Sequence, residues 1–210
     1  MFSIILNVIG SLMHFYVAQR LHALGPIRAR IPARWWWLGA LVVWAVYLLG
    51  VRLGDAALDW RWWPGQFAMT WLGILFVMTQ YLLLADLVTG FGLWLRQWAP
   101  RILAAGAIAG VAVSAFAIFQ ALRAPAIVEH ELTLAGLPKE LDGMTLVAIS
   151  HTHLGAQRRA AWLGKRIDQI NALNPAAVVM LGDQVEDEPI NDDQLAPVLR
   201  RLHPPLGVWR

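Results

Sequence analysis

The sequence predicts a membrane domain of about four transmembrane helices, followed by a small α/β domain with a mainly parallel sheet. Of the 210 residues, 58% are hydrophobic and 15% are charged, and the mean hydropathy is +0.52, which is too apolar for a soluble domain. The apolar excess lies before Arg123, whereas short apolar runs alternate with polar loops after Pro125. We therefore expect a transmembrane helical domain at residues 1–124 and an α/β domain at residues 125–210.

Four stretches approach the length that spans a bilayer, whose ~30 Å hydrocarbon core needs ~20 residues of helix. They are residues 2–18, 36–51, 66–87 and 102–122. The first stretch lacks the basic start and the small-residue cleavage site of a signal peptide, so we expect it to be retained as a span. Many of the 12 tryptophans lie near the ends of these runs, where an indole ring fits the headgroup region. The chain is therefore expected to be an integral membrane protein in contact with the lipid bilayer.

The arginines predict an orientation. Six of them, Arg20, Arg28, Arg30, Arg34, Arg96 and Arg101, lie in the connections after the first and third spans. The second connection holds two arginines beside two aspartates. By the positive-inside rule the first and third connections face the cytoplasm, so both chain ends and the α/β domain are expected outside it.

Polar side chains inside the spans have two explanations. Asn7, His14 and Asp86 could mark a proton or ion path, because ionisable groups in a bilayer are costly and often functional. We favour placement near the interface, since His14 and Asp86 lie close to predicted span ends and no charged partner recurs in the other spans.

Composition excludes several functional classes. The chain has no cysteine, which excludes disulfides, thiolate nucleophiles and cysteine-bound zinc. Its net charge of +3 and pI of about 9.8 come from scattered arginines, without the basic stripe and interleaved aromatics of a nucleic-acid surface. We therefore expect no nucleic-acid partner.

The region after Pro125 predicts an alternation of strands and helices. The runs "AIVEHELTL", "MTLVAIS", "AAVVML" and "LGVW" have the pattern of strands, and the middle two are apolar enough to be buried on both faces. Leu163, Ile167 and Ile170 recur at helical spacing before "NP", which ends that helix. A second helix, which begins near Asp193, carries Leu195, Val198, Leu199 and Leu202.

Two polar clusters follow the two buried strands. One is Ser150, His151, Thr152 and His153; the other is Gly182, Asp183, Glu186 and Asp187. In such sheets, ligands bind beyond the carboxyl ends of the strands, and a right-handed crossover brings the two loops together. Imidazole nitrogens and carboxylates at one point suit a divalent metal, which makes His151, His153 and Asp183 the candidate ligands. The alternative is that Asp183 forms an Asx turn or helix cap and that the histidines face water.

These motifs also resemble a known family. The segments "LPKELDGMTLVAISHTHLG", "INALNPAAVVMLGDQVED" and "LAPVLRRLHPPLGVW", within residues 129–209, are similar to the opening of a calcineurin-like metallophosphoesterase of the membrane-anchored bacterial type. The resemblance implies a site for two metal ions, manganese, iron or zinc, in a bacterial inner or plasma membrane protein. It makes His153 the metal-binding histidine of the first motif and Asp183 the carboxylate that bridges the two metals.

Two departures from the family pattern bear on activity. His151 stands where the family usually has aspartate, so a neutral nitrogen replaces an anionic oxygen, although imidazole can still ligate a metal. The sequence reaches Arg210 directly after "GVW", where the family continues with a Gly-Asn-His motif and later histidines. The resemblance therefore implies the N-terminal part of a metallophosphoesterase domain, an incomplete partial α/β sandwich, at residues 125–210.

Two functions follow from these observations. The first is a membrane-anchored, metal-dependent phosphoesterase that hydrolyses a phosphomonoester or phosphodiester, with a membrane-associated substrate expected beside the spans. The second is a non-catalytic integral membrane protein with a truncated or degenerate phosphoesterase tail. The family resemblance favours the first, while the missing motif and His151 support the second as the alternative. Very low activity is expected of the 210 residues alone, and no residue is assigned as a catalytic acid or base.

Overall fold

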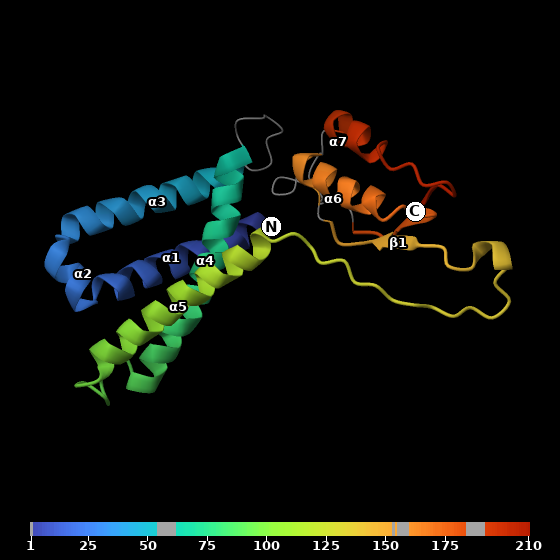
Figure 1. The fold of residues 1–210 in the computed structure, drawn as a ribbon. Helices are drawn as coiled ribbons and strands as arrows, with labels where there is room; N and C mark the ends of the chain where they lie inside the picture. The colour runs from blue at the N-terminus through green and yellow to red at the C-terminus, as the bar shows by residue number, and fades with distance from the viewer. Residues whose placement is uncertain (1, 54–61, 153, 155–159, 184–191) are drawn as a thin grey trace. The chain divides into compact units, whose positions relative to one another are not determined.

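A computed structural model describes residues 2–53, 62–152, 154, 160–183 and 192–210 of the chain. Within these residues the chain divides into two compact units, one that holds the long helices up to Pro125 and one that begins at Ala126 (Figure 1). We call them the helical unit and the α/β unit and describe each by itself.

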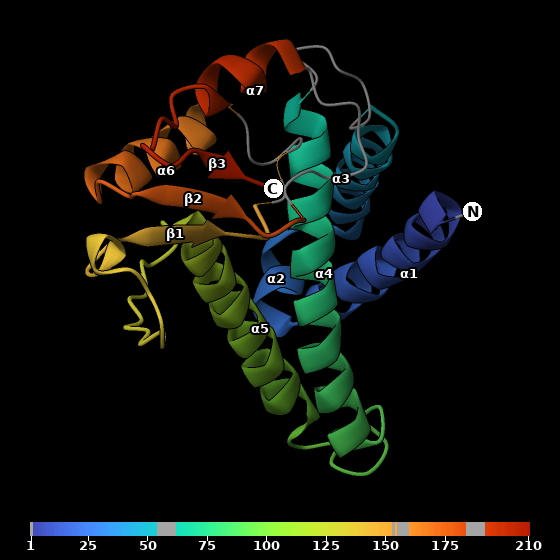
Figure 2. The ribbon, with the colours of Figure 1, turned by 90° about the vertical axis from the view of Figure 1, so that its right-hand side faces the viewer.

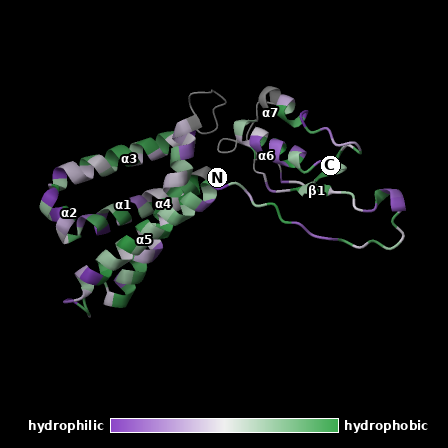
Figure 3. Cartoon of the chain, viewed as in Figure 1, coloured by the Kyte–Doolittle hydropathy of each residue, from purple (hydrophilic) through white to green (hydrophobic). Residues whose placement is uncertain are grey.

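The helical unit contains four helices that are long and apolar enough to cross a membrane, as the sequence predicts. Figure 3 shows that their residues are mostly hydrophobic and that hydrophilic residues lie in a short helix, α2, between the first two. Their bounds are α1 Phe2–His22, α2 Gly25–Arg30, α3 Ala33–Leu53, α4 Trp62–Thr89 and α5 Ala99–Leu122.

The first two spans are longer than the apolar runs that predict them. α1 and α3 each have 21 residues. α1 continues through Arg20, and α3 begins before Trp35, because charged and indole side chains at helix ends reach the headgroup region without breaking the helix. Both helices therefore reach the length of a full span.

Small residues allow the long helices to approach one another closely. A Cβ atom on Gly50 of α3 would collide with the backbone oxygen of Pro64 in α4. A Cβ on Gly106 of α5 would lie 2.9 Å from the backbone oxygen of Tyr81 in α4. Close backbone approach of this kind replaces the hydrophobic effect as a source of helix association in lipid, because both environments are apolar.

Two ionisable side chains lie inside the helical unit. Asp86 is 4% exposed and forms an ion pair with Arg20 Nε at 2.7 Å, outside hydrogen-bond geometry, while the Tyr16 hydroxyl donates to the same carboxylate oxygen at 2.6 Å. His14 is 3% exposed. Both groups are enclosed by protein in the helical unit, and Asp86 has a charged partner that was not expected from the sequence. Its partner lies in the last turn of α1, beyond the predicted end of the first span.

The α/β unit contains a three-stranded parallel sheet in the order β1-β2-β3, shown in Figure 2. The strands are β1 Leu146–Ile149, β2 Ala177–Met180 and β3 Val208–Trp209. This confirms that "MTLVAIS" and "AAVVML" form adjacent parallel strands and that "LGVW" supplies a third. The fold class is thus four long apolar helices followed by a small parallel α/β region.

Two helices cover one face of this sheet (Figure 2): α6 Ala160–Ala172 and α7 Asp192–Leu199. Leu163, Ile167 and Ile170 of α6 are buried, as their spacing predicts, and they belong to one cluster with Val178 of β2. α6 ends at Ala172, just before the "NP" dipeptide. One apolar stripe on a helix therefore supplies three of the seven buried residues described in this core.

The first predicted strand is absent. Residues 126–134 have no regular secondary structure, and Leu132 and Leu134 are 77% and 60% exposed. An apolar alternation forms a strand only when a neighbouring strand satisfies its backbone groups, and none of the described strands pairs with this segment. A turn of 3-10 helix, Lys139–Leu141, then leads to β1.

Candidate metal centre

The ends of β1 and β2 hold the two polar loops next to each other. Ile149 is paired with Met180 at the last position of the ladder. Beyond it, the backbone N–H of Leu181 donates to the carbonyl of Ile149 at 2.8 Å, and that of His151 donates to the carbonyl of Gly182 at 3.4 Å. Because these bonds continue the pairing past the strands, the loops begin side by side at the carboxyl edge of the sheet.

The backbone at this edge has left-handed conformations. His151 has φ of 55°, Gly182 of 93° and Asp183 of 52°. Glycine adopts this region freely, but a residue with a Cβ costs roughly 1–2 kcal/mol there. Two non-glycine residues with this strain face each other across the two loops, and such strain is concentrated at functional sites.

The side chains of these two residues meet. His151 Nε2 lies 3.4 Å from Asp183 Oδ2, and the side chains are 75% and 44% exposed. An imidazole nitrogen and a carboxylate oxygen at this distance make an ion pair when the histidine is protonated. Both groups can also reach a solute from solvent.

The geometry of this pair suits a shared metal ion. Zinc binds imidazole nitrogen and carboxylate oxygen at about 2.0–2.2 Å, so two ligands of one tetrahedral ion lie about 3.3–3.5 Å apart. The observed separation of 3.4 Å matches that value. One nitrogen and one oxygen donor also fit the preferences of manganese and iron as well as zinc.

Two of the three predicted ligands are therefore brought together. The third, His153, lies outside the described residues, as do Glu186 and Asp187 of the second loop. Among the described residues, no group of three or more histidine, cysteine, aspartate or glutamate side chains is placed to hold a metal. The pair His151 and Asp183 is what the described geometry offers.

Sequence reasoning missed the residues that fix the first loop. Thr152 is 7% exposed and Leu154 is 1% exposed, and Leu154 belongs to the core cluster of the α/β unit. Burial of these two residues anchors the chain immediately after the histidine at 151. The signal was present in "HTHLG", where a leucine follows polar residues in a predicted loop.

One comparison with known proteins found a distant relative. It is 29% identical over 97 residues to a curated protein of Danio rerio described as "Transmembrane protein with metallophosphoesterase domain". The match covers 46% of this chain and 22% of that relative, so the chain spans only a small part of the relative's length. No family model matches the chain. No solved structure matches it at a significant level.

Proposed function

We propose that this chain belongs to a membrane-anchored, metal-dependent phosphoesterase, and that residues 125–210 form the N-terminal part of its metallophosphoesterase domain. The observation that carries the proposal is the meeting of His151 and Asp183, 3.4 Å apart, at the carboxyl edge of a parallel sheet. Four candidate spans together with a distant transmembrane relative that has a metallophosphoesterase domain support the same assignment.

Each residue has a definite part in the proposed site. The Asp183 carboxylate binds a divalent cation and offsets part of its charge, and the neutral His151 imidazole supplies a nitrogen donor. His153 is proposed as the third ligand, by the resemblance of its motif. A divalent ion supplies, when bound, polarisation of a phosphoryl oxygen and activation of a water molecule. The proposed substrate is a phosphomonoester or phosphodiester, with membrane-associated esters favoured by the neighbouring spans.

Metal uptake by the purified chain in detergent tests the site directly. We expect Asp183→Ala and His153→Ala to abolish binding of Mn²⁺ or Zn²⁺, measured by metal analysis after gel filtration. His151→Asp should keep binding and shift preference toward Mn²⁺, because an oxygen replaces a nitrogen. Asp142→Ala and His130→Ala are matched controls, since both residues precede β1 and lie outside the proposed ligand set. Uptake that survives Asp183→Ala would contradict the assignment.

Hydrolysis of p-nitrophenyl phosphate and bis(p-nitrophenyl) phosphate tests the reaction class. Metal-dependent turnover that disappears in Asp183→Ala supports a phosphoesterase, however slow the turnover of this chain is. A second protein for this assay has the remainder of a longer phosphoesterase domain fused after Arg210. If that fusion binds metal but hydrolyses neither ester, the non-catalytic alternative is favoured. The observation that favours this alternative is His151, which stands where the family usually has aspartate.

We also propose that the α/β unit lies on the extracytoplasmic side, because six arginines occupy the first and third connections. Alkaline phosphatase fused after Arg210 should be active, and green fluorescent protein at the same position should be dark when exported through the general secretory route. The opposite pattern would reverse the orientation while leaving the four spans in place.

A further inference from the structure

The helical unit contains an apolar pocket between α1, α3 and α4. Its volume is about 330 Å³, and its hydrocarbon lining includes Val17, Leu21, Ile31, Val43 and Leu75. This is near the lower limit of small-molecule sites, which span roughly 300–1,000 Å³. The size suits one hydrocarbon chain rather than a whole lipid.

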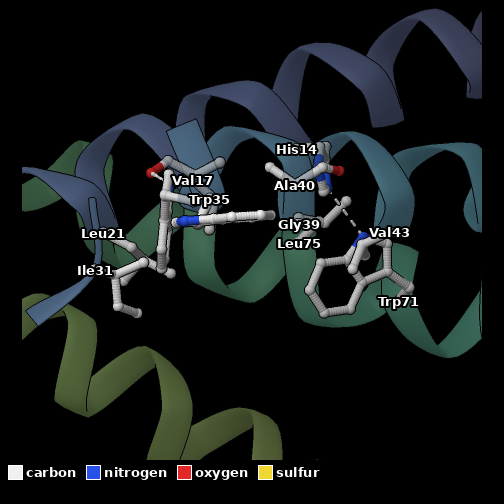
Figure 4. A pocket seen from close by; sticks show the side chains of 12 residues that line it. His14, Val17, Leu21, Ile31, Trp35, Gly39, Ala40, Val43, Trp71 and Leu75 are labelled. Carbon is white, nitrogen blue, oxygen red and sulfur yellow. Dashed lines mark hydrogen bonds between the residues drawn. The ribbon is translucent and has the colours of Figure 1, made fainter. Parts of the chain in front are cut away.

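The inner end of the pocket has its polar atoms satisfied. The indole N–H of Trp71 donates to His14 Nδ1 at 3.2 Å (Figure 4). Because Nδ1 accepts, the imidazole proton is on Nε2, which donates to the carbonyl of Ala40 at 2.9 Å. His14 therefore ties α4 and α3 to α1 and presents a neutral ring to the pocket. An apolar occupant fits this end, since a polar one would gain no donor or acceptor from the imidazole nitrogens.

Arginines neighbour the lining residues at the outer end of the pocket. Trp35 lines the pocket and is 58% exposed, and the Arg34 guanidinium lies 5.7 Å from the centre of its ring. Ile31, also in the lining, follows directly after α2, whose Arg28 and Arg30 are in its last turn and which has no buried residue. Arginines near a membrane surface attract anionic headgroups, with about 1 kcal/mol for each.

The lining of the pocket extends along α3 for most of the thickness of one leaflet. From Trp35 to Val43, both in its lining, α3 rises about 12 Å at ~1.5 Å for each residue. Half of a ~30 Å hydrocarbon core is ~15 Å. A chain whose headgroup lies at the arginines would therefore reach the His14 end within a single leaflet.

We propose that this pocket holds one acyl chain of an anionic membrane phospholipid, whose phosphate lies near Arg34, Arg28 and Arg30. An acyl chain gains little free energy by moving from the bilayer into an apolar pocket, because both surroundings are hydrocarbon. Selectivity among lipids therefore comes from the charge of the headgroup and from packing in the pocket. This inference rests on the helical unit alone and is independent of the proposed phosphoesterase function.

Gly39 offers a way to fill the pocket without disturbing the helices. It lines the pocket, and a Cβ at this position would meet no atom within 4 Å. Gly39→Leu therefore places a side chain beside Trp35 and Leu75 (Figure 4). Gly73→Leu is the matched control, because Gly73 lies in α4, outside the lining, and its Cβ also meets no atom within 4 Å.

The test uses the full chain in phosphatidylcholine nanodiscs that contain traces of a photoreactive lipid. Phosphatidylglycerol and phosphatidylcholine carry the same diazirine-labelled acyl chain, and mass spectrometry maps the crosslinked residues. We expect labels from the anionic lipid to concentrate on Val17, Val43 and Leu75, at a yield at least about fivefold above the zwitterionic lipid, the factor that corresponds to ~1 kcal/mol from a single basic residue. Gly39→Leu should remove this concentration, and Gly73→Leu should keep it.

Charge variants test the headgroup part separately. Arg34→Gln should reduce the preference for phosphatidylglycerol, whereas Arg96→Gln, in the third connection, should leave it unchanged. Even labelling of all lipid-facing helices, pocket labelling that persists in Gly39→Leu, or equal yields from the two lipids would each overturn the proposal. So would protein crosslinks showing that a second copy of the chain fills the pocket.

Discussion

Both units of this chain enclose apolar side chains, but among the described residues the helical unit alone also encloses ionisable ones. The helical unit encloses His14 and Asp86, 3% and 4% exposed, while Ile108 on α5 is 70% exposed. The α/β unit encloses Ile167 and Val178, 1% and 0% exposed, with charged groups such as Asp168 on its surface. The difference follows from the surrounding medium, because lipid gives no reason to hide apolar groups and a strong reason to pair polar ones. In water the hydrophobic effect reverses the preference.

This contrast decides what the sequence can predict. In the α/β unit one stripe of apolar residues, Leu163, Ile167 and Ile170, points to the core, so the helix and its buried face were predicted correctly. The membrane helices are apolar on all sides, and their length is predictable while their packing faces are not. The α/β unit therefore has a core that can be located from the sequence.

The largest expected effect comes from a charge in the core of the α/β unit. Ile167→Asp buries an unpaired carboxylate among apolar side chains and should cost about 4–5 kcal/mol, enough to unfold a marginal domain. Hydrogen exchange of the full chain in nanodiscs should show lost protection in α6 and β2 and retained protection in α1, α4 and α5. Lys165→Asp, on the exposed side of the same helix, should leave both units protected. Loss of protection throughout would show that the units unfold as one.

The next effect tests polar pairing in the helical unit. Asp86→Ala leaves Arg20 without the carboxylate that it contacts at 2.7 Å. Breaking a buried ion pair costs about 3–5 kcal/mol, and we expect about 3 kcal/mol because the Arg20 side chain is 25% exposed. The unfolding free energy in detergent measures this change. Replacing both partners, as in Arg20→Met with Asp86→Leu, should recover most of the loss, and a loss equal to that of the single variant would contradict the pairing explanation.

The candidate metal site was predictable only in part, and for a physical reason. Strand ends and the polar residues beyond them follow from local pattern, so His151 and Asp183 could be placed at one edge of the sheet. The left-handed φ values of both residues and the burial of Leu154 depend on tertiary contacts, which a local pattern does not contain. The same limit explains the missed contact between Arg20 and Asp86, which lie in different helices.

Helix contact through glycine should have a smaller effect. Gly50→Ala adds a methyl group that collides with the Pro64 backbone, so α3 and α4 must separate, at a cost of about 1–3 kcal/mol. Gly73→Ala adds the same group where no atom lies within 4 Å and should be neutral or stabilising by up to about 1 kcal/mol, because alanine favours helix. Thermal unfolding in detergent compares the two variants. Equal effects would show that close approach at Gly50 does not contribute to helix association.

The smallest effect concerns the hydrogen bond between Trp71 and His14. Trp71→Phe keeps an aromatic ring on α4 but removes the N–H that donates to His14 Nδ1 at 3.2 Å. Interhelical hydrogen bonds in membranes contribute only about 0.6 kcal/mol on average, because polar groups also find partners in the unfolded state within the bilayer. We therefore expect a loss of about 0.6 kcal/mol beyond that of the control Trp63→Phe, whose indole is 50% exposed on the same helix. A loss above about 3 kcal/mol would mean that the hydrogen bond from Trp71 to His14 and the one from His14 to the Ala40 carbonyl strengthen each other as one cooperative network. The buried polar groups of the helical unit would then fix its structure as firmly as the apolar core fixes the α/β unit.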